Sequence, residues 1–171
     1  RHRRPLARLA LTRELARRRV YARGAVLGEV LDMLREGRLT IGEQAFLEPD
    51  VWLTGTGRIT IGEGVYLNRG VMVAAMDLVE IGEHTMVANG ALITDADHVV
   101  GDRERPISWQ GYASKGPTRI GANCWLGANV VVTSGVTIGD RCIIGANYTV
   151  TRALPAPPPA LGSPARGGGC L

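Results

Sequence analysis

The sequence is organised by aliphatic residues that recur every six positions over most of its length. A period of six fits neither an α-helix nor a simple β-strand, whose side chains repeat every 3.6 and every 2 residues. It fits a chain that turns a corner after each short strand and places one aliphatic side chain inside each time. Fifteen residues form this column: Ile41, Leu47, Leu53, Ile61, Leu67, Val73, Ile81, Val87, Ile93, Ile120, Leu126, Val132, Ile138, Ile144 and Val150.

A second column lies four residues after the first and consists mainly of small or β-branched residues. Such residues suit the corners of a triangular coil, where little volume remains beside the aliphatic side chains. With three hexads to a coil, the two columns predict an all-β prism of about five coils, stacked about 4.8 Å apart. The second column comprises Ala45, Val51, Gly57, Val65, Val71, Thr85, Ala91, Cys124, Val130, Val136 and Cys142.

The repeat divides the chain of 171 residues into three parts. The residues before it predict helices, because the apolar residues between Val26 and Leu34 fall on one helical face that Gly37 ends. An earlier helix is expected over residues 6–21. The parts are a helical N-terminal segment at 1–38, a coil domain at 39–155 with a protruding loop at 99–118, and a C-terminal tail at 156–171.

The net charge of +4 is unevenly distributed, since residues 1–38 hold 11 arginines and only 4 acidic residues. The run Arg17–Arg19 allows two interpretations: a solvated helical face, or a surface for nucleic acid or anionic lipid. No aromatic residues are interleaved with the run and no nucleic-acid motif accompanies it, so we favour the solvated face and expect no nucleic-acid partner. No apolar run is long enough for a membrane span and no segment resembles a signal peptide, which favours a cytoplasmic protein.

Several segments of the second half resemble the late coils of hexapeptide-repeat acyltransferases. They are Ile120-Gly-Ala-Asn-Cys-Trp-Leu-Gly-Ala-Asn129, Gly135–Gly139, Ile144–Asn147 and the closing Gly162–Arg166. The Asp95-x-Asp97-His98 motif ahead of a loop, followed by Gly116-Pro117, is most similar to sugar and polysaccharide O-acetyltransferases. Maltose, galactoside and xenobiotic acetyltransferases are wider relatives.

This resemblance implies a left-handed parallel β-helix, acetyl-CoA as the acyl donor, and a hydroxyl of a sugar or sugar-like molecule as the acceptor. It also implies a homotrimer with the active site between subunits, in which the N-terminal helices cap the prism or pack against a neighbour. Transfer to an amine, and a non-enzymatic β-helix scaffold or regulatory module, stay open as alternatives. The carbonic anhydrases of this architecture need three zinc-binding histidines that this chain cannot supply, and no metal is expected.

Acyl transfer from a thioester to a hydroxyl requires a base, and histidine suits that task near neutral pH. Of the three histidines, His98 is the sixth residue of its hexad, outside the interior columns and next to the long loop. Because it also matches the family's catalytic histidine, we predict His98 as the general base. Asp95 and Asp97 flank it, and either carboxylate is a candidate to orient the imidazole. A metal site at these three residues is the weaker alternative, since nearly consecutive ligands seldom complete one.

The resemblance places a groove for coenzyme A along the late coils. Trp125 is predicted to form its wall or, alternatively, a subunit contact, and Gly127 and Ala128 leave room for the pantetheine arm to reach the backbone. In the loop, Trp109 and Tyr112 are candidates for contacting the sugar or, equally, for packing on the adjacent subunit. The other predicted coenzyme contacts are Ser134, Ala146, Thr151, Arg152 and Arg166, of which Arg166 meets the phosphates or is simply solvated.

Three interior positions predict special packing. Tyr148 stands where the family has serine, so its side chain must either point outward or plug the end of the prism. Cys124 and Cys142 are one coil apart in the second column. We expect stacked, buried thiols there rather than a disulfide or a nucleophile.

Overall fold

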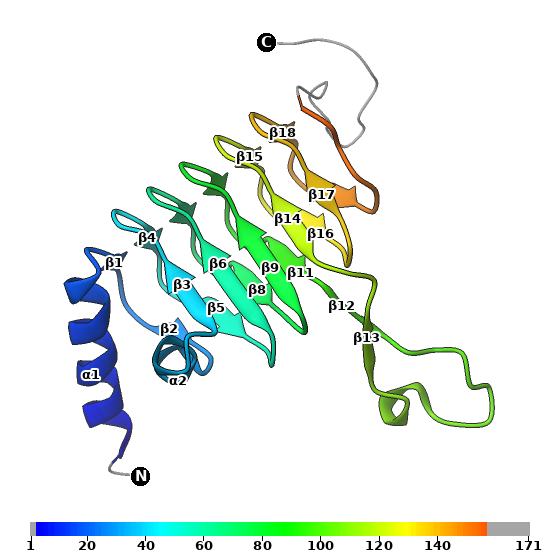
Figure 1. Ribbon diagram of the computed structural model, residues 1–171, viewed down its shortest axis with the longest axis horizontal. Coiled ribbons are helices and arrows are strands. Elements are labelled where there is room, and N and C mark those ends of the chain that lie inside the picture. The colour runs from blue at the N-terminus through cyan, green and yellow to red at the C-terminus, as the bar shows by residue number, and fades with distance from the viewer. Residues whose placement is uncertain (1–2, 157–171) are drawn as a thin grey trace.

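In the computed structural model, which describes residues 3–156, three parallel β-sheets form the sides of a triangular prism (Figure 1). Sheet A contains β1 (Tyr21–Ala22), β4 (Phe46–Leu47), β7 (Tyr66–Leu67), β10 (Met86–Val87), β15 (Trp125–Leu126) and β18 (Ile143–Ile144). Sheet B contains β2 (Val26–Leu27), β5 (Val51–Thr54), β8 (Met72–Ala74), β11 (Leu92–Thr94), β16 (Val131–Val132) and β19 (Thr149–Val150). Sheet C contains β3 (Leu39–Ile41), β6 (Arg58–Ile61), β9 (Leu78–Ile81), β14 (Thr118–Ile120) and β17 (Thr137–Ile138).

The chain visits the sheets in the order C, A, B on every coil, and equivalent residues of successive coils lie in register. Leu47 pairs with Leu67, and Ile61 pairs with Ile81. The predicted left-handed parallel β-helix of about five coils, with a helical N-terminus and a protruding loop, is confirmed. All fifteen residues of the six-residue column are buried, so this column is the core of the protein.

The N-terminal segment differs in part from the helices predicted over residues 6–21 and 26–34. Helix α1 (Arg3–Arg17) begins and ends earlier than the helix expected over residues 6–21. Helix α2 (Val30–Arg35) has six residues, and its apolar side packs on the core. Between them, β1 and β2 add an incomplete first coil by pairing with β4 and β5. Gly24 and Gly28 have positive φ angles, which interrupt a helix, and the strand edge of the first full coil offers backbone partners instead.

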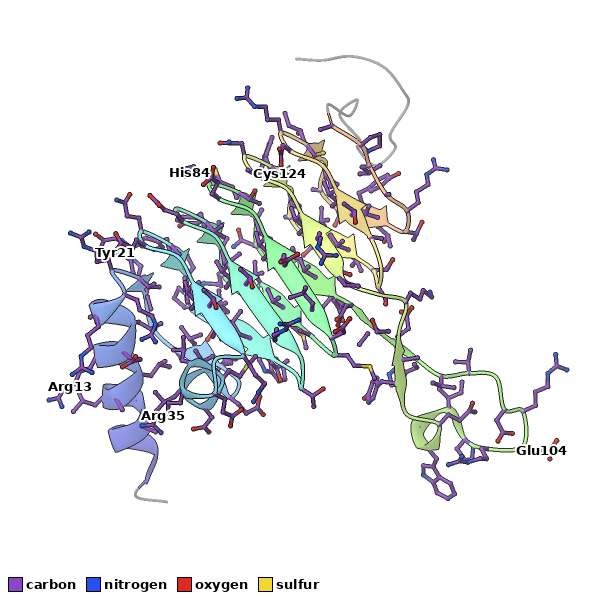
Figure 2. All side chains as sticks on the ribbon, viewed as in Figure 1. Arg13, Tyr21, Arg35, His84, Glu104 and Cys124 are labelled. Carbon is purple, nitrogen blue, oxygen red and sulfur yellow. The ribbon has the colours of Figure 1, made fainter. Side chains whose placement is uncertain are left out.

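The long loop leaves the prism at the corner between sheets B and C as a two-stranded antiparallel hairpin, here called the arm (residues 96–114). It consists of β12 (Ala96–His98), a 3-10 turn η1 (Ile107–Trp109) and β13 (Tyr112–Ser114). The Gln110 side-chain amide donates to the backbone carbonyls of Asp102 and Arg105 and so holds the tip together. Figure 2 shows Glu104 at the far end of the arm, away from the coils, and Trp109 on the same tip is 71% exposed.

The outer surfaces of the three sheets differ in polarity. Sheets A and B carry mainly apolar side chains outward, whereas sheet C carries polar ones. The outward column of sheet A is Tyr21, Phe46, Tyr66, Met86, Trp125 and Ile143. That of sheet B is Leu27, Trp52, Met72, Leu92, Val131 and Thr149, and that of sheet C is Thr40, Thr60, Glu80, Arg119 and Thr137.

Cys124, Cys142 and Tyr148 occupy the last coils. Cys124 and Cys142 are free, buried thiols, and both sulfur atoms lie near the Gly139 carbonyl oxygen, at 3.2 and 2.9 Å. The ring of Tyr148 is partly buried and packs against the core, which corresponds to the plugging alternative. Neither helix within residues 3–156 is long and apolar enough to cross a membrane.

Candidate functional site

The root of the arm is built on Asp95, whose side chain is fully buried. Its carboxylate accepts hydrogen bonds from the backbone N–H groups of Met76 (2.6 Å), Asp77 (2.7 Å) and Leu78 (2.6 Å). These amides belong to the corner of the preceding coil. A carboxylate that three amides hold in this way is a structural anchor, and Asp95 does not contact the imidazole of His98. The expectation that Asp95 is a candidate to orient the histidine is therefore corrected.

Ser134 is the second part of this anchor. Its hydroxyl donates to the backbone carbonyl of Asp95 (2.5 Å) and accepts from the backbone N–H of Lys115 (2.8 Å), so that it joins the two ends of the arm. The buried Thr118 hydroxyl lies 2.9 Å from the carbonyl oxygen of Thr94. With its hydroxyl buried and occupied on both sides, Ser134 is an internal connector. The predicted contact of Ser134 with coenzyme A stays a prediction, and its hydroxyl is already engaged on both sides.

His98 lies on β12 with its side chain exposed, directly opposite Tyr112 on β13. The two ring centroids are 4.5 Å apart and the ring planes are tilted by 38°. Side chains alternate between the two sides of a strand, so Asp97 points to the opposite side of the hairpin. There its Oδ2 atom lies 2.7 Å from the Nζ atom of Lys115, the only lysine of the chain. Within residues 3–156, neither aspartate makes a hydrogen bond to the imidazole.

Two of these contacts were not found from the sequence. The sequence pattern assigns no role to Lys115, and it makes Tyr112 a candidate only for contacting the sugar or a neighbouring subunit. The loop composition gave no sign that residues 96–98 and 112–114 pair as strands. Once that pairing is known, the register that sets His98 against Tyr112 follows from the position of the turn.

The predicted coenzyme contacts that the structure describes lie at two separate places on the prism. Trp125 projects from sheet A and is 51% exposed, and Ala128 and Ala146 follow at the corner between sheets A and B. Thr151 and Arg152 are exposed at the other corner, between sheets B and C, on the C-terminal side of the arm. Arg166 lies outside the described residues. A single prism therefore presents the two groups on different edges.

Gly127 has a structural reason to be glycine. A Cβ atom at this position would lie 2.5 Å from the backbone nitrogen of Ala146 on the next coil. Such an approach is too close for any side chain, so coil stacking requires glycine here. The residue is buried, and its small size is not explained by room for a ligand.

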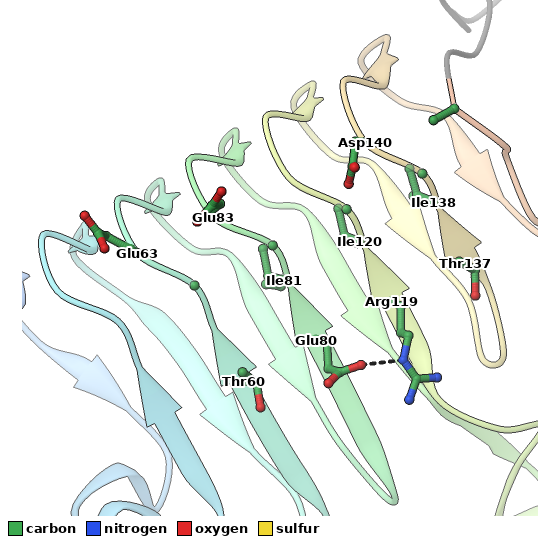
Figure 3. A pocket seen from close by; sticks show the side chains of 15 residues that line it. Thr60, Glu63, Glu80, Ile81, Glu83, Arg119, Ile120, Thr137, Ile138 and Asp140 are labelled. Carbon is green, nitrogen blue, oxygen red and sulfur yellow. Dashed lines mark hydrogen bonds and ion pairs between the residues drawn. The ribbon is translucent and has the colours of Figure 1, made fainter.

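A shallow groove of about 620 Å³ follows the outer side of sheet C and its corner with sheet A (Figure 3). Figure 3 shows Glu63, Glu83 and Asp140 along this corner, and an ion pair between Arg119 and Glu80 on the strands. None of the predicted site residues lines the groove. In the part of the chain that the structure describes, no group of three His, Cys, Asp or Glu side chains is placed to hold a metal ion.

The sequence model described as the hexapeptide repeat of succinyl-transferase matches residues 117–152. A probable acetyltransferase of Mycobacterium tuberculosis is 38% identical over 74 residues, which cover 43% of this chain and 24% of that protein. A putative acetyltransferase of Staphylococcus aureus is 37% identical over 57 residues, which cover 33% of this chain and 29% of that protein. The chain thus spans less than a third of the length of these relatives.

Among solved structures, the N-acyltransferase AntD of Bacillus cereus, crystallised with dTDP-4-amino-4,6-dideoxyglucose and coenzyme A, has a TM-score of 0.72 at 15% identity. That alignment covers 88% of this chain and 79% of AntD, and it shows a common fold. The hexapeptide-repeat acetyltransferase VCA0836 of Vibrio cholerae has a TM-score of 0.55 at 25% identity, over 90% of this chain and 71% of its own. The predicted resemblance to hexapeptide-repeat acyltransferases is confirmed.

Proposed function

We propose that this chain is a coenzyme A-dependent acyltransferase that moves an acetyl group from acetyl-CoA to a hydroxyl of a sugar or sugar-like acceptor, with His98 as the general base. One observation carries the proposal. A single exposed histidine stands on an arm whose root is fixed by buried polar groups, beside hexapeptide coils similar to those of acetyltransferases.

The reaction requires the base to take the proton of the acceptor hydroxyl while its oxygen attacks the thioester carbonyl carbon. The carbon–sulfur bond then breaks, and coenzyme A leaves as the thiol. An imidazole with both nitrogens accessible suits the proton transfer near neutral pH. His98 makes no side-chain hydrogen bond to another residue of the described part, 3–156, so its nitrogens remain open to an acceptor hydroxyl.

Coenzyme A would lie between two subunits of a homotrimer. One subunit offers Trp125, Ala128 and Ala146 at its A–B corner, and the next offers Thr151 and Arg152 at its B–C corner together with the arm. This arrangement accounts for the separation of the predicted contacts on one prism. Arg166 remains a candidate partner of the phosphates.

The polarity of the outer surfaces supports the trimer. Two of the three sheets carry apolar outward columns, and exposed apolar patches of this extent mark protein contacts. Contact of sheet A on one subunit with sheet B on the next is heterologous, and such a contact closes into a ring when the rotation permits it. The polar sheet C would then face solvent.

An amine acceptor is the second candidate, because AntD, which shares the fold, is an N-acyltransferase whose structure holds an amino-sugar nucleotide. A cytoplasmic location fits both acceptors, since acetyl-CoA is used there and the two core cysteines are unpaired. A scaffold without activity is the alternative that the experiment must separate from these.

The test is turnover of acetyl-CoA, followed as release of free thiol, with a panel of sugars, nucleotide sugars and amino sugars. The variant His98→Asn is compared with His84→Asn, an exposed turn histidine with a φ of 56° that asparagine tolerates. We expect turnover on one acceptor class that falls by about 10²- to 10⁴-fold in His98→Asn and persists in His84→Asn. Absence of turnover, together with absence of coenzyme A binding by calorimetry, supports the scaffold instead.

A further inference from the structure

Within residues 3–156, the imidazole of His98 has one aromatic neighbour, the ring of Tyr112. We propose that Tyr112 is the positioning residue of His98 and that neither aspartate of the Asp95-x-Asp97-His98 motif has this role. The proposal rests on the proposed function, because it gives Tyr112 a task only where His98 is the base. It replaces the expectation that Tyr112 contacts the sugar.

The geometry of the arm supports this assignment. His98 and Tyr112 are direct cross-strand partners in the antiparallel pairing of β12 with β13. Their ring centroids are 4.5 Å apart, within the range of aromatic contact, and the rings are tilted by 38°. Cross-strand pairs of this kind restrict the rotation of both side chains.

The two aspartates are occupied elsewhere. The Asp95 carboxylate accepts from three backbone amides below the arm. The Asp97 carboxylate lies on the other side of the hairpin, paired with Lys115. Because β-strand side chains alternate, Asp97 cannot turn toward His98 without a change of register in the arm.

A ring contact also differs chemically from a carboxylate contact. A carboxylate that orients a histidine takes one ring nitrogen as its hydrogen-bond donor. The ring of Tyr112 holds the plane of the imidazole and leaves both nitrogens for the substrates. His98 and Tyr112 are both exposed on this hairpin. Such a contact therefore removes rotational freedom that the base would lose on reaching the transition state.

The first measurement reads the contact without reference to activity. Ring protons of His98 are observed by NMR in histidine-labelled protein and assigned with His98→Asn. We expect the ring-current shift of the natural protein to persist in Tyr112→Phe and to move toward the value of an exposed histidine in Tyr112→Ala. An unchanged shift in Tyr112→Ala means that the rings do not touch, and overturns the proposal.

The second measurement is steady-state kinetics on the same variants. We expect kcat to fall about 10- to 100-fold in Tyr112→Ala with nearly unchanged KM values, and to recover to within roughly twofold in Tyr112→Phe. Ile107→Ala, which removes an exposed apolar side chain from the same arm, is the control and should retain kcat. If instead KM for the acceptor rises in both Tyr112 variants while kcat holds, the hydroxyl binds the acceptor and the positioning role is wrong.

The variant Asp97→Asn tests the competing assignment, in which Asp97 rather than Tyr112 orients the imidazole of His98. A loss of kcat equal to that of Tyr112→Ala, with the ring-current shift intact, would make Asp97 the orienting residue. A natural protein that shows the ring-current shift but no turnover on any acceptor overturns the proposed function, and the positioning role with it. A natural protein that shows turnover but no ring-current shift at His98 overturns only the positioning role.

Discussion

The Ser134 hydroxyl donates a 2.5 Å hydrogen bond to the backbone carbonyl of Asp95, which lies 39 residues earlier in the chain. The sequence suggested separate tasks for these residues, one at a coenzyme groove and one beside a base. In the structure they form one buried connection between the arm and the coil below it. The arm that carries His98 is therefore fixed to the prism by polar groups that water does not reach.

The buried carboxylate of Asp95 should be essential for stability. In Asp95→Asn, an amide NH₂ replaces one oxygen and faces a backbone N–H donor, so that two donors oppose each other without water. We expect a loss of about 3 kcal/mol in the free energy of unfolding, measured with urea at a fixed protein concentration. Asp97→Asn, at the partly exposed pair with Lys115, should lose less than about 1 kcal/mol. Equal losses in the two variants would show that the three amides do not need the charge of Asp95.

The corner glycine Gly127 should resist even the smallest side chain. Gly127→Ala places a Cβ atom 2.5 Å from the backbone of Ala146 and forces the two coils apart. We expect a loss of about 1–3 kcal/mol in the free energy of unfolding. Gly101→Ala is the control, because nothing lies within 4 Å of its Cβ position, and it should change stability by less than about 0.5 kcal/mol. A neutral Gly127→Ala would mean that the coils separate at no cost.

Stability should decline in alkaline solution through the core thiols. Burial, followed by the neighbouring Cys124, raises the pKa of the Cys142 thiol from the usual 9.0 to about 12. The unfolded chain therefore releases this proton near pH 9, while the folded chain keeps it until about pH 12. The contribution of the neutral thiol is complete below pH 9 and is lost as the pH rises toward 12.

The variant Cys142→Ala removes this titration. Its free energy of unfolding, measured with urea at successive alkaline pH values, should fall less steeply than that of the natural protein. Ile144→Val, a core change without a titrating group, is the control and should lower the curve without changing its slope. Parallel curves for the natural protein and Cys142→Ala would contradict the raised pKa.

The outward columns of the sheets predict where subunits meet. Met86→Glu on sheet A and Met72→Glu on sheet B each place a charge in an apolar column and should convert the proposed trimer to monomers. Thr137→Glu, on the polar sheet C, should leave the assembly intact. Light scattering coupled to size-exclusion chromatography measures the masses. Dissociation by Thr137→Glu alone would assign the contact to sheet C.

The sequence by itself determined the prism. A hexad that places one aliphatic residue inward repeats fifteen times, and each repeat needs only its neighbours on the adjacent coils, so the columns, the number of coils and the buried cysteines follow from a local pattern. The same holds for the position of the arm, because it is the one long interruption of the period. The exposure of His98 follows from its place outside both columns.

The tertiary structure decided what the side chains around His98 do. Asp95 lies just before β12 and Asp97 lies on it, two residues later. Yet the side chain of Asp95 turns into a corner of the preceding coil, and Asp97 pairs with Lys115 across the hairpin. The incomplete first coil was likewise hidden, because a helical spacing of apolar residues at 26–34 was overridden by strand pairing with β5. Each of these outcomes rests on partners 17 to 39 residues away in the chain, such as Lys115 for Asp97 and Ser134 for Asp95. A pattern of near neighbours does not encode them.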